Sequence, residues 1–159
     1  MSAHAVVITC STRAAAGVYT DRTGPLLVEA CRSYGLECAD AVVVPDGPAV
    51  EAALRDAVAS GARLVLTTGG TGIAPSDTTP EATRAVVERE VPGIGELLRA
   101  AGVAKGVPTA ALSRGTAGTV GNTLVVNTPG SVGGVRDAVA VLADVVPHAL
   151  DQLAGGDHR

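Results

Sequence analysis

Short apolar runs alternate with helical patterns along the first part of the chain. The runs at residues 5–9, 41–44 and 64–66 are rich in aliphatic and β-branched side chains, which predicts buried strands. Between them, apolar side chains recur at helical spacing over residues 25–34 and 50–59, which predicts amphipathic helices. Strands and helices that alternate through short connections form a parallel sheet with right-handed crossovers. The pattern therefore predicts an α/β fold.

The second half of the chain continues with helices and then returns to strands. Helical spacing of apolar residues predicts three further helices, at residues 80–89, 94–101 and 135–150. From Pro108 onward we expect strands, including a buried one at residues 123–127, with a connecting turn near Gly121 and Asn122. Residues 154–159 are expected to form a frayed tail. At 159 residues, the chain has the length of one domain, so we predict a single domain over residues 1–159.

The strand at residues 64–66 runs directly into a glycine-rich loop. Glycine lets backbone N–H groups approach an anion closely, and ligands of open α/β sheets bind beyond the carboxyl ends of the strands. A helix should begin just after the loop, with Thr79 as its cap, because Pro80 is tolerated at the first helical position. We therefore place the candidate active site at this loop, whose glycines are Gly69, Gly70 and Gly72.

Two acidic residues are expected at the same edge of the sheet. Asp46 follows the strand at residues 41–44, and Asp77 lies in the glycine-rich loop. The carboxyl ends of parallel strands open on one edge, so both carboxylates and the loop that begins at Cys10 should converge there. Carboxylates beside a phosphate-binding backbone suit Mg²⁺, which bridges substrate phosphates. The alternatives are that Asp46 only forms a turn and that Asp77 only interacts with the helix start.

Other catalytic classes lack the residues they require. A phosphate-binding P-loop needs a lysine after its last glycine, where this chain has Ile73, and GGTG lacks the spacing of a dinucleotide-binding fingerprint. The three histidines lie near the chain ends, and no GxSxG nucleophile motif occurs. The three cysteines have neither CxxC pairs nor histidine-spaced partners, so buried thiols are expected instead of disulfides or a zinc site.

Composition and charge limit the core residues, the binding partners and the cellular compartment that we expect. Phenylalanine and tryptophan are absent, so valine, alanine and leucine must fill the core. The formal net charge is −4 and no stretch clusters lysine and arginine, so we expect no nucleic-acid partner. The apolar stretch at the N-terminus is too short for a signal peptide, and no stretch is long enough to span a bilayer. We therefore expect a cytoplasmic protein without a membrane partner.

An ordered set of motifs resembles the Mog/MoaB family of molybdenum-cofactor biosynthesis. The motifs are STR at residues 11–13 with GVYTD at 17–21, VPD at 44–46, TTGGTG at 67–72 with SDTTPEAT at 76–83, PGIGE at 92–96, LSRG at 112–115 and NTPGS at 127–131. They run through nearly the whole chain. The resemblance implies a three-layer α/β/α molybdopterin-binding domain with a mostly parallel sheet, commonly assembled as a homotrimer.

The resemblance also implies an activity and a set of site residues. Mog-type members are molybdopterin adenylyltransferases that use ATP and Mg²⁺ and release pyrophosphate, and a separate protein then inserts molybdate. Carried over by motif, Asp46 and Asp77 are the catalytic pair, with Asp46 as the metal ligand. The implied substrate-binding residues are Ser11, Thr12, Asp21, Thr68, Gly69, Gly70, Thr71, Gly72, Ser76, Ser113, Pro129, Gly130 and Ser131.

Two other functions stay open at this point. The MoaB branch shares nearly all of these motifs, so the alternative is a MoaB-type protein that binds molybdopterin without adenylyltransferase activity. A nucleotide-binding or regulatory protein unrelated to pterins is the second alternative. The chain also departs from the family pattern at Ser131, where many members have asparagine, which changes one hydrogen-bonding group of the pocket.

Overall fold

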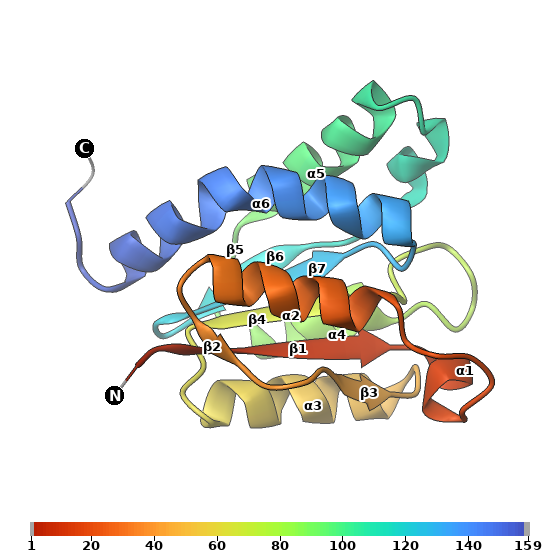
Figure 1. The fold of residues 1–159 in the computed structure, drawn as a ribbon, viewed down its shortest axis with the longest axis horizontal. Coiled ribbons are helices and arrows are strands. Elements are labelled where there is room, and N and C mark those ends of the chain that lie inside the picture. The colour runs from red at the N-terminus through yellow and green to blue at the C-terminus, as the bar shows by residue number, and fades with distance from the viewer. Residues whose placement is uncertain (1, 158–159) are drawn as a thin grey trace.

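A mixed sheet forms the middle layer of the computed structural model, which describes residues 2–157 (Figure 1). Its strands are β1 (His4–Cys10), β2 (Glu37–Cys38), β3 (Val42–Val44), β4 (Leu64–Thr68), β5 (Arg89–Glu90), β6 (Ala117–Val120) and β7 (Thr123–Thr128). The order is β2-β1-β4-β7-β6-β5, and β3 also pairs with β1. All pairings are parallel except β6 with β7 and β5 with β6. The predicted α/β fold with a mostly parallel sheet is confirmed.

Helices cover both faces of this sheet, which makes three layers. They are α1 (Thr12–Ala15), α2 (Thr23–Ser33), α3 (Pro48–Ala59), α4 (Thr79–Val86), α5 (Pro92–Ala104), the 3₁₀ helix η1 (Pro108–Leu112) and α6 (Val132–Leu153). The helices α2, α5 and α6 pack on one face, and α3 and α4 pack on the other (Figure 1). Among the described residues, no helix is both long enough and apolar enough to span a membrane.

The central strands are apolar on both faces because both faces are covered. Leu64 and Leu66 pack with the helices of the α2 and α6 side, whereas Val65 between them packs with α3 and α4. The same division continues in β7, where Val125 is paired in register with Val65. Continuous apolar runs are typical of parallel strands buried on both sides. Strands β4 and β7 are therefore firmly held, and the loops at their carboxyl ends start from fixed positions.

Three predicted elements differ from the structure between residues 79 and 112. The helix predicted at residues 80–89 ends at Val86, and Arg89–Glu90 forms β5 instead, because these two residues pair with β6. The strand expected after Pro108 is the 3₁₀ helix η1. The predicted end of the 94–101 helix at Gly102 is also wrong, because α5 continues to Ala104. Gly102 has no side chain, and this lets α5 pack closely on Ala110.

Two smaller differences concern helix ends. Thr78 is the N-terminal flanking residue of α4, and Thr79 is its first helical residue, whose amide donates to the carbonyl oxygen of Gly70 at 3.1 Å. At the other end of the chain, the amide of Gly156 donates to the carbonyl oxygen of Asp151 at 2.9 Å, which closes the end of α6. The frayed tail predicted for residues 154–159 includes residues 158–159, which lie outside the described residues.

Candidate functional site

The candidate site lies where the carboxyl ends of β1, β4 and β7 meet. Gly69 and Gly70 follow β4 with φ angles of +90° and +66°, a left-handed conformation that glycine adopts without strain. A side chain on Gly69 would lie 2.5 Å from the carbonyl oxygen of Cys10 in β1. The amide of Gly69 donates to the carbonyl oxygen of Thr128 in β7 at 3.3 Å. Only glycine therefore allows the loop to turn between its two neighbouring strands.

A hollow of about 830 Å³, here called the first-loop hollow, opens beside this turn. The loop after β1 forms one wall, and the turn after β3 and the glycine-rich loop complete it. The predicted site residues that line it are Ser11, Thr12, Asp21, Asp46, Thr68, Gly69, Gly70, Ser76, Asp77 and Gly130. The convergence of Asp46, Asp77 and the first loop at one edge of the sheet is thus confirmed.

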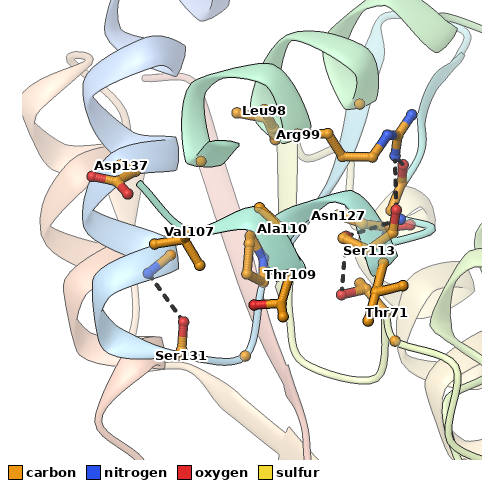
Figure 2. Close-up of a pocket in the computed structure, with 18 of the residues that line it drawn as sticks. Thr71, Leu98, Arg99, Val107, Thr109, Ala110, Ser113, Asn127, Ser131 and Asp137 are labelled. Atoms are coloured by element: carbon orange, nitrogen blue, oxygen red, sulfur yellow. Dashed lines mark hydrogen bonds between the residues drawn. The ribbon is translucent and has the colours of Figure 1, made fainter. Parts of the chain in front are cut away.

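A second cavity of about 480 Å³, here called the α5–α6 pocket, lies between α5 with η1 and the first turn of α6 (Figure 2). The predicted site residues around it are Gly70, Thr71, Gly72, Asp77, Ser113, Pro129, Gly130 and Ser131. Its walls also include side chains that were not among the predicted site residues, namely Leu98, Arg99, Val107, Thr109, Ala110, Asn127 and Asp137. The pocket therefore combines apolar walls with a few polar groups, as small-molecule sites do.

The two cavities share a boundary made of Gly70, Asp77 and Gly130. The backbone is bare here, and a side chain on Gly130 would lie only 3.2 Å from the Cα atom of Gly69. Ligands in the two cavities would thus meet across exposed backbone and one carboxylate. Every predicted site residue lines at least one of the two cavities. Their roles in binding and catalysis stay predictions.

Asp46 is fixed by the first loop and keeps one carboxylate oxygen free. The amide and the hydroxyl of Thr12 donate to Asp46 Oδ2 at 3.2 and 3.0 Å, and the amide of Asp46 donates back to the Thr12 hydroxyl at 3.1 Å. The other oxygen, Oδ1, is buried and accepts no hydrogen bond within the described part of the chain. A buried oxygen without a partner is costly unless a ligand satisfies it.

The surroundings of Asp46 fit a metal ion that arrives with a substrate. Residues 2–157 contain no group of three or more histidine, cysteine, aspartate or glutamate side chains arranged to hold a metal. Mg²⁺ does not need such a cage, because it keeps several waters and binds one or two carboxylates together with substrate phosphates. The free Oδ1 atom of Asp46 is an oxygen donor of this kind.

Arg114 holds the glycine-rich loop in shape. Its guanidinium donates to the carbonyl oxygens of Gly72 and Asp77, both at 2.8 Å, and its amide donates to the carbonyl oxygen of Thr71 at 2.7 Å. It also pairs with Glu81, and this hydrogen bond lowers the pKa of the Glu81 carboxyl. Within the loop, the amide of Ala74 donates to Asp77 Oδ2 at 3.0 Å. The sequence motif contained Arg114, but its contacts lie more than thirty residues away, so spacing could not indicate this role.

Asn127 links the core to the site through a buried network. Its Nδ2 donates to the hydroxyls of Thr67 and Thr83 at 3.0 and 2.8 Å, and its Oδ1 accepts from the amide of Thr116 at 3.1 Å. These bonds connect β7 with β4, α4 and the segment that leads into β6. The sequence offered two signals, the NTPGS motif that begins with Asn127 and a polar side chain at the end of an otherwise apolar strand, but neither indicated these distant partners.

Other predicted site residues make hydrogen bonds that stabilise the walls of the two cavities. Asp21 accepts from the hydroxyl of Thr9 at 2.8 Å and from the amide of Gly24 at 3.0 Å, so both of its oxygens are occupied. Ser131 caps α6 by accepting from the amide of Gly134 at 3.1 Å (Figure 2). The hydroxyl of Thr68 donates to the carbonyl oxygen of Pro129 at 2.7 Å, which ties the ends of β4 and β7 together.

The three cysteines are buried and free, as predicted. Burial raises the pKa of the Cys10 thiol to about 11 and also raises the pKa values of Cys31 and Cys38. Because the thiolate is the reactive form, we expect the native protein to resist iodoacetamide at pH 8 while the urea-unfolded protein takes up three groups. Intact-mass spectrometry measures this directly. Rapid labelling of Cys10 in the native protein would contradict the burial described here.

Comparison with known proteins gives matches to molybdopterin-related proteins over nearly the whole chain. A family model described as "Probable molybdopterin binding domain" matches residues 6–148. A protein named molybdopterin adenylyltransferase from Helicobacter pylori strain J99 is 36% identical over 156 residues, which cover 96% of this chain and 88% of the relative. Two further relatives are named molybdenum cofactor biosynthesis bifunctional protein, and the chain spans about half of their length, 48% and 49%.

Solved structures of both branches are similar to this fold. The Mog protein from Mycobacterium ulcerans is 52% identical, with a TM-score of 0.91 and coverage of 96% of this chain and 99% of that one. The MoaB protein from Thermus thermophilus is 42% identical, with a TM-score of 0.88 and full coverage of both chains. The similarity extends through all the elements that enclose the two cavities.

Proposed function

Since the chain belongs to the Mog/MoaB family of molybdopterin-binding proteins, we propose that it is a molybdopterin adenylyltransferase of molybdenum cofactor biosynthesis. In this reaction, an oxygen of the terminal phosphate of molybdopterin forms a bond to the α-phosphorus of ATP. The bond from that phosphorus to the oxygen bridging the α- and β-phosphates breaks, and pyrophosphate leaves. The products are adenylyl-molybdopterin and pyrophosphate.

The observation that carries this proposal is the shared boundary of the two cavities. A transfer between two substrates requires both to be bound at once with their reacting groups in contact. The first-loop hollow and the α5–α6 pocket adjoin at Gly70, Asp77 and Gly130, which line both of them. A single-ligand binding site does not need two such compartments.

The character of each cavity supports an assignment of the substrates. We assign the pterin to the α5–α6 pocket, where Leu98, Val107 and Ala110 offer apolar contacts to a ring system. Its terminal phosphate would lie at the glycine-rich loop, whose bare backbone allows close approach. We assign the ATP phosphates to the first-loop hollow, which contains Asp46 with its free Oδ1.

We propose that Mg²⁺ enters with ATP and binds to Asp46. When bound, the ion would neutralise phosphate charge, which is its usual contribution to phosphoryl transfer. The residues of the chain serve to position the groups. Thr12 fixes the Asp46 carboxylate, and Arg114 fixes the loop from Thr71 to Asp77.

The chain needs no nucleophile of its own for this reaction. The attacking oxygen belongs to molybdopterin, so the protein aligns the two substrates and balances charge. Cys10 is near the loop, but its side chain is buried and its pKa is raised to about 11, so the thiol stays protonated at neutral pH. The site therefore suits direct transfer without a covalent enzyme intermediate.

The second candidate function is that of a MoaB-type protein that binds molybdopterin without adenylylating it. The observation that favours this second function is the full-length similarity to the MoaB protein from Thermus thermophilus. In that case, the α5–α6 pocket would bind the pterin, and the first-loop hollow would not support transfer of an adenylyl group from ATP.

Label transfer separates these two functions. We expect purified protein given molybdopterin, Mg²⁺ and ATP labelled at the α-phosphorus to move the label onto the pterin. Samples without molybdopterin, or with excess EDTA, should retain the label in ATP. Binding of molybdopterin, measured in parallel by fluorescence, with no label transfer would reject the enzyme and support the MoaB-type function.

The family resemblance also supports two wider proposals. We propose that the protein works as a homotrimer in the cytoplasm. We further propose that adenylyl-molybdopterin passes to a separate protein that inserts molybdate.

A further inference from the structure

A cationic side chain stands at the rim of the first-loop hollow, on the short helix α1. Figure 1 places α1 just beyond the carboxyl end of β1 and close to β3. The guanidinium carbon of Arg13 lies 5.8 Å from the centre of the Tyr19 ring, within the range of a cation–π contact. Both residues line the hollow, and neither was among the predicted site residues.

Arg13 has no acidic partner within residues 2–157. The ion pairs found in that part of the chain are made by other arginines, Arg55, Arg84 and Arg114. The carboxylate of Asp21, which also lines the hollow, already accepts hydrogen bonds from Thr9 and Gly24. The positive charge of Arg13 is therefore available to a ligand in the hollow.

Tyr19 is in turn fixed by Ser11, the residue that caps α1. Its hydroxyl lies 2.7 Å from the hydroxyl of Ser11, which also accepts from the amide of Ala14 as the cap of α1. Tyr19 is 49% exposed, so this hydrogen bond is needed to hold its ring in one place. An arginine that is already oriented loses less conformational freedom when it binds an anion. Arg22 also lines the hollow, but within residues 2–157 no aromatic contact of this kind orients it.

Because acidic residues line the hollow, a polyphosphate needs a cation in order to bind there. Asp46 and Asp77 both line it, so a bare polyphosphate would be repelled. A metal ion at Asp46 neutralises part of that charge, and Arg13 follows directly after Thr12, which holds Asp46. The guanidinium fork is suited to phosphate oxygens, which it binds through two parallel hydrogen bonds.

We propose that Arg13, oriented by Tyr19, contacts the phosphates of ATP in the first-loop hollow and determines affinity for the nucleotide. This inference rests on the proposed function, because it assigns the nucleotide to this hollow. Tyr19 is a positioning residue that acts through Arg13. Neither residue is required for binding of molybdopterin in the α5–α6 pocket.

Calorimetric titration with Mg²⁺-ATP tests the inference without any turnover. We expect Arg13→Ala to raise the Kd for Mg²⁺-ATP about tenfold or more, as for loss of a hydrogen bond to a charged group. Arg13→Lys keeps the charge but loses the fork, so its Kd should lie between those of wild type and Arg13→Ala. Higher salt should weaken ATP binding to wild type more than to Arg13→Ala. Molybdopterin binding should not change in either variant.

Two further variants separate a positioning role from a loss of fold. Tyr19→Phe keeps the ring and removes the hydroxyl contact with Ser11, and we expect a smaller rise in Kd, of about threefold. Arg136→Ala is the matched control, because Arg136 is exposed on α6, lines neither cavity and carries the same charge. It should bind ATP as wild type does, and thermal melting should show that all the variants are folded.

The outcomes distinguish this inference from the proposed function. Label transfer by wild type together with unchanged ATP affinity in folded Arg13→Ala would overturn the role of Arg13 and leave the enzyme intact. Weakened ATP binding in Arg13→Ala, with no label transfer by wild type, would support the role of Arg13 and reject the transferase. Wild-type protein that does not bind Mg²⁺-ATP would overturn both.

Discussion

Asp46→Asn is expected to lower the rate of adenylyl transfer about a hundredfold to a thousandfold while the protein stays folded. Asparagine has nearly the same shape and can still accept the hydrogen bonds from Thr12. It removes the negative charge and the free carboxylate oxygen, which is the group that we assign to the metal of Mg²⁺-ATP. The effect should therefore fall on turnover, with little change in the affinity for molybdopterin.

The steady-state rate of pyrophosphate release tests this prediction, and thermal melting shows whether the variant is folded. Asp144→Asn is the matched control, because Asp144 is exposed on α6, lines neither cavity and undergoes the same loss of charge. We expect the control to turn over at the wild-type rate. A folded Asp46→Asn variant that also turns over at that rate would show that Asp46 has no catalytic role.

The largest effect on stability is expected for Asn127→Leu, which should lower the free energy of unfolding by about 3 kcal/mol. The substitution leaves the buried amide of Thr116 without its acceptor and removes the donor for two buried threonine hydroxyls, Thr67 and Thr83. Unpaired buried polar groups each cost on the order of 1–3 kcal/mol. Leucine is apolar and of similar size, so it cannot restore any of these bonds.

Urea unfolding followed by circular dichroism measures this loss. Asn122→Ala serves as the control, because the side chain of Asn122 is exposed in the turn between β6 and β7, and its change should stay within about 0.5 kcal/mol. A loss of less than about 1 kcal/mol for Asn127→Leu would mean that the network is not important for stability. The network matters to the site as well, since Thr83 lies in α4, whose first residue donates to the Gly70 carbonyl.

The sheet could be predicted because its central strands are buried on both faces. Residues 64–66 and 124–126 form continuous apolar runs, and each run is part of a strand that helices cover on both sides. The position of the site followed from the same topology. Once the strands were expected to be parallel, Asp46 and Asp77 had to lie at one edge, where the structure has them.

The remaining features depend on contacts that are distant in the sequence. Arg89–Glu90 is a strand of two exposed residues without an apolar pattern, and its pairing with β6 alone defines it. The clamp that Arg114 makes on the glycine-rich loop depends on the path of η1 and the segment after it. The division into two cavities also needs α5 and η1 in place, and no local pattern specifies how α5 packs on η1 and on α6.

The measurement that tests the central claim most directly is pyrophosphate release compared with the amount of adenylyl-molybdopterin formed by the wild-type protein. Two substrates that meet at Gly70, Asp77 and Gly130 should give one pyrophosphate for each adenylyl-molybdopterin. We expect release only when ATP, Mg²⁺ and molybdopterin are all present. Tight binding of molybdopterin with no pyrophosphate release from ATP would contradict the claim.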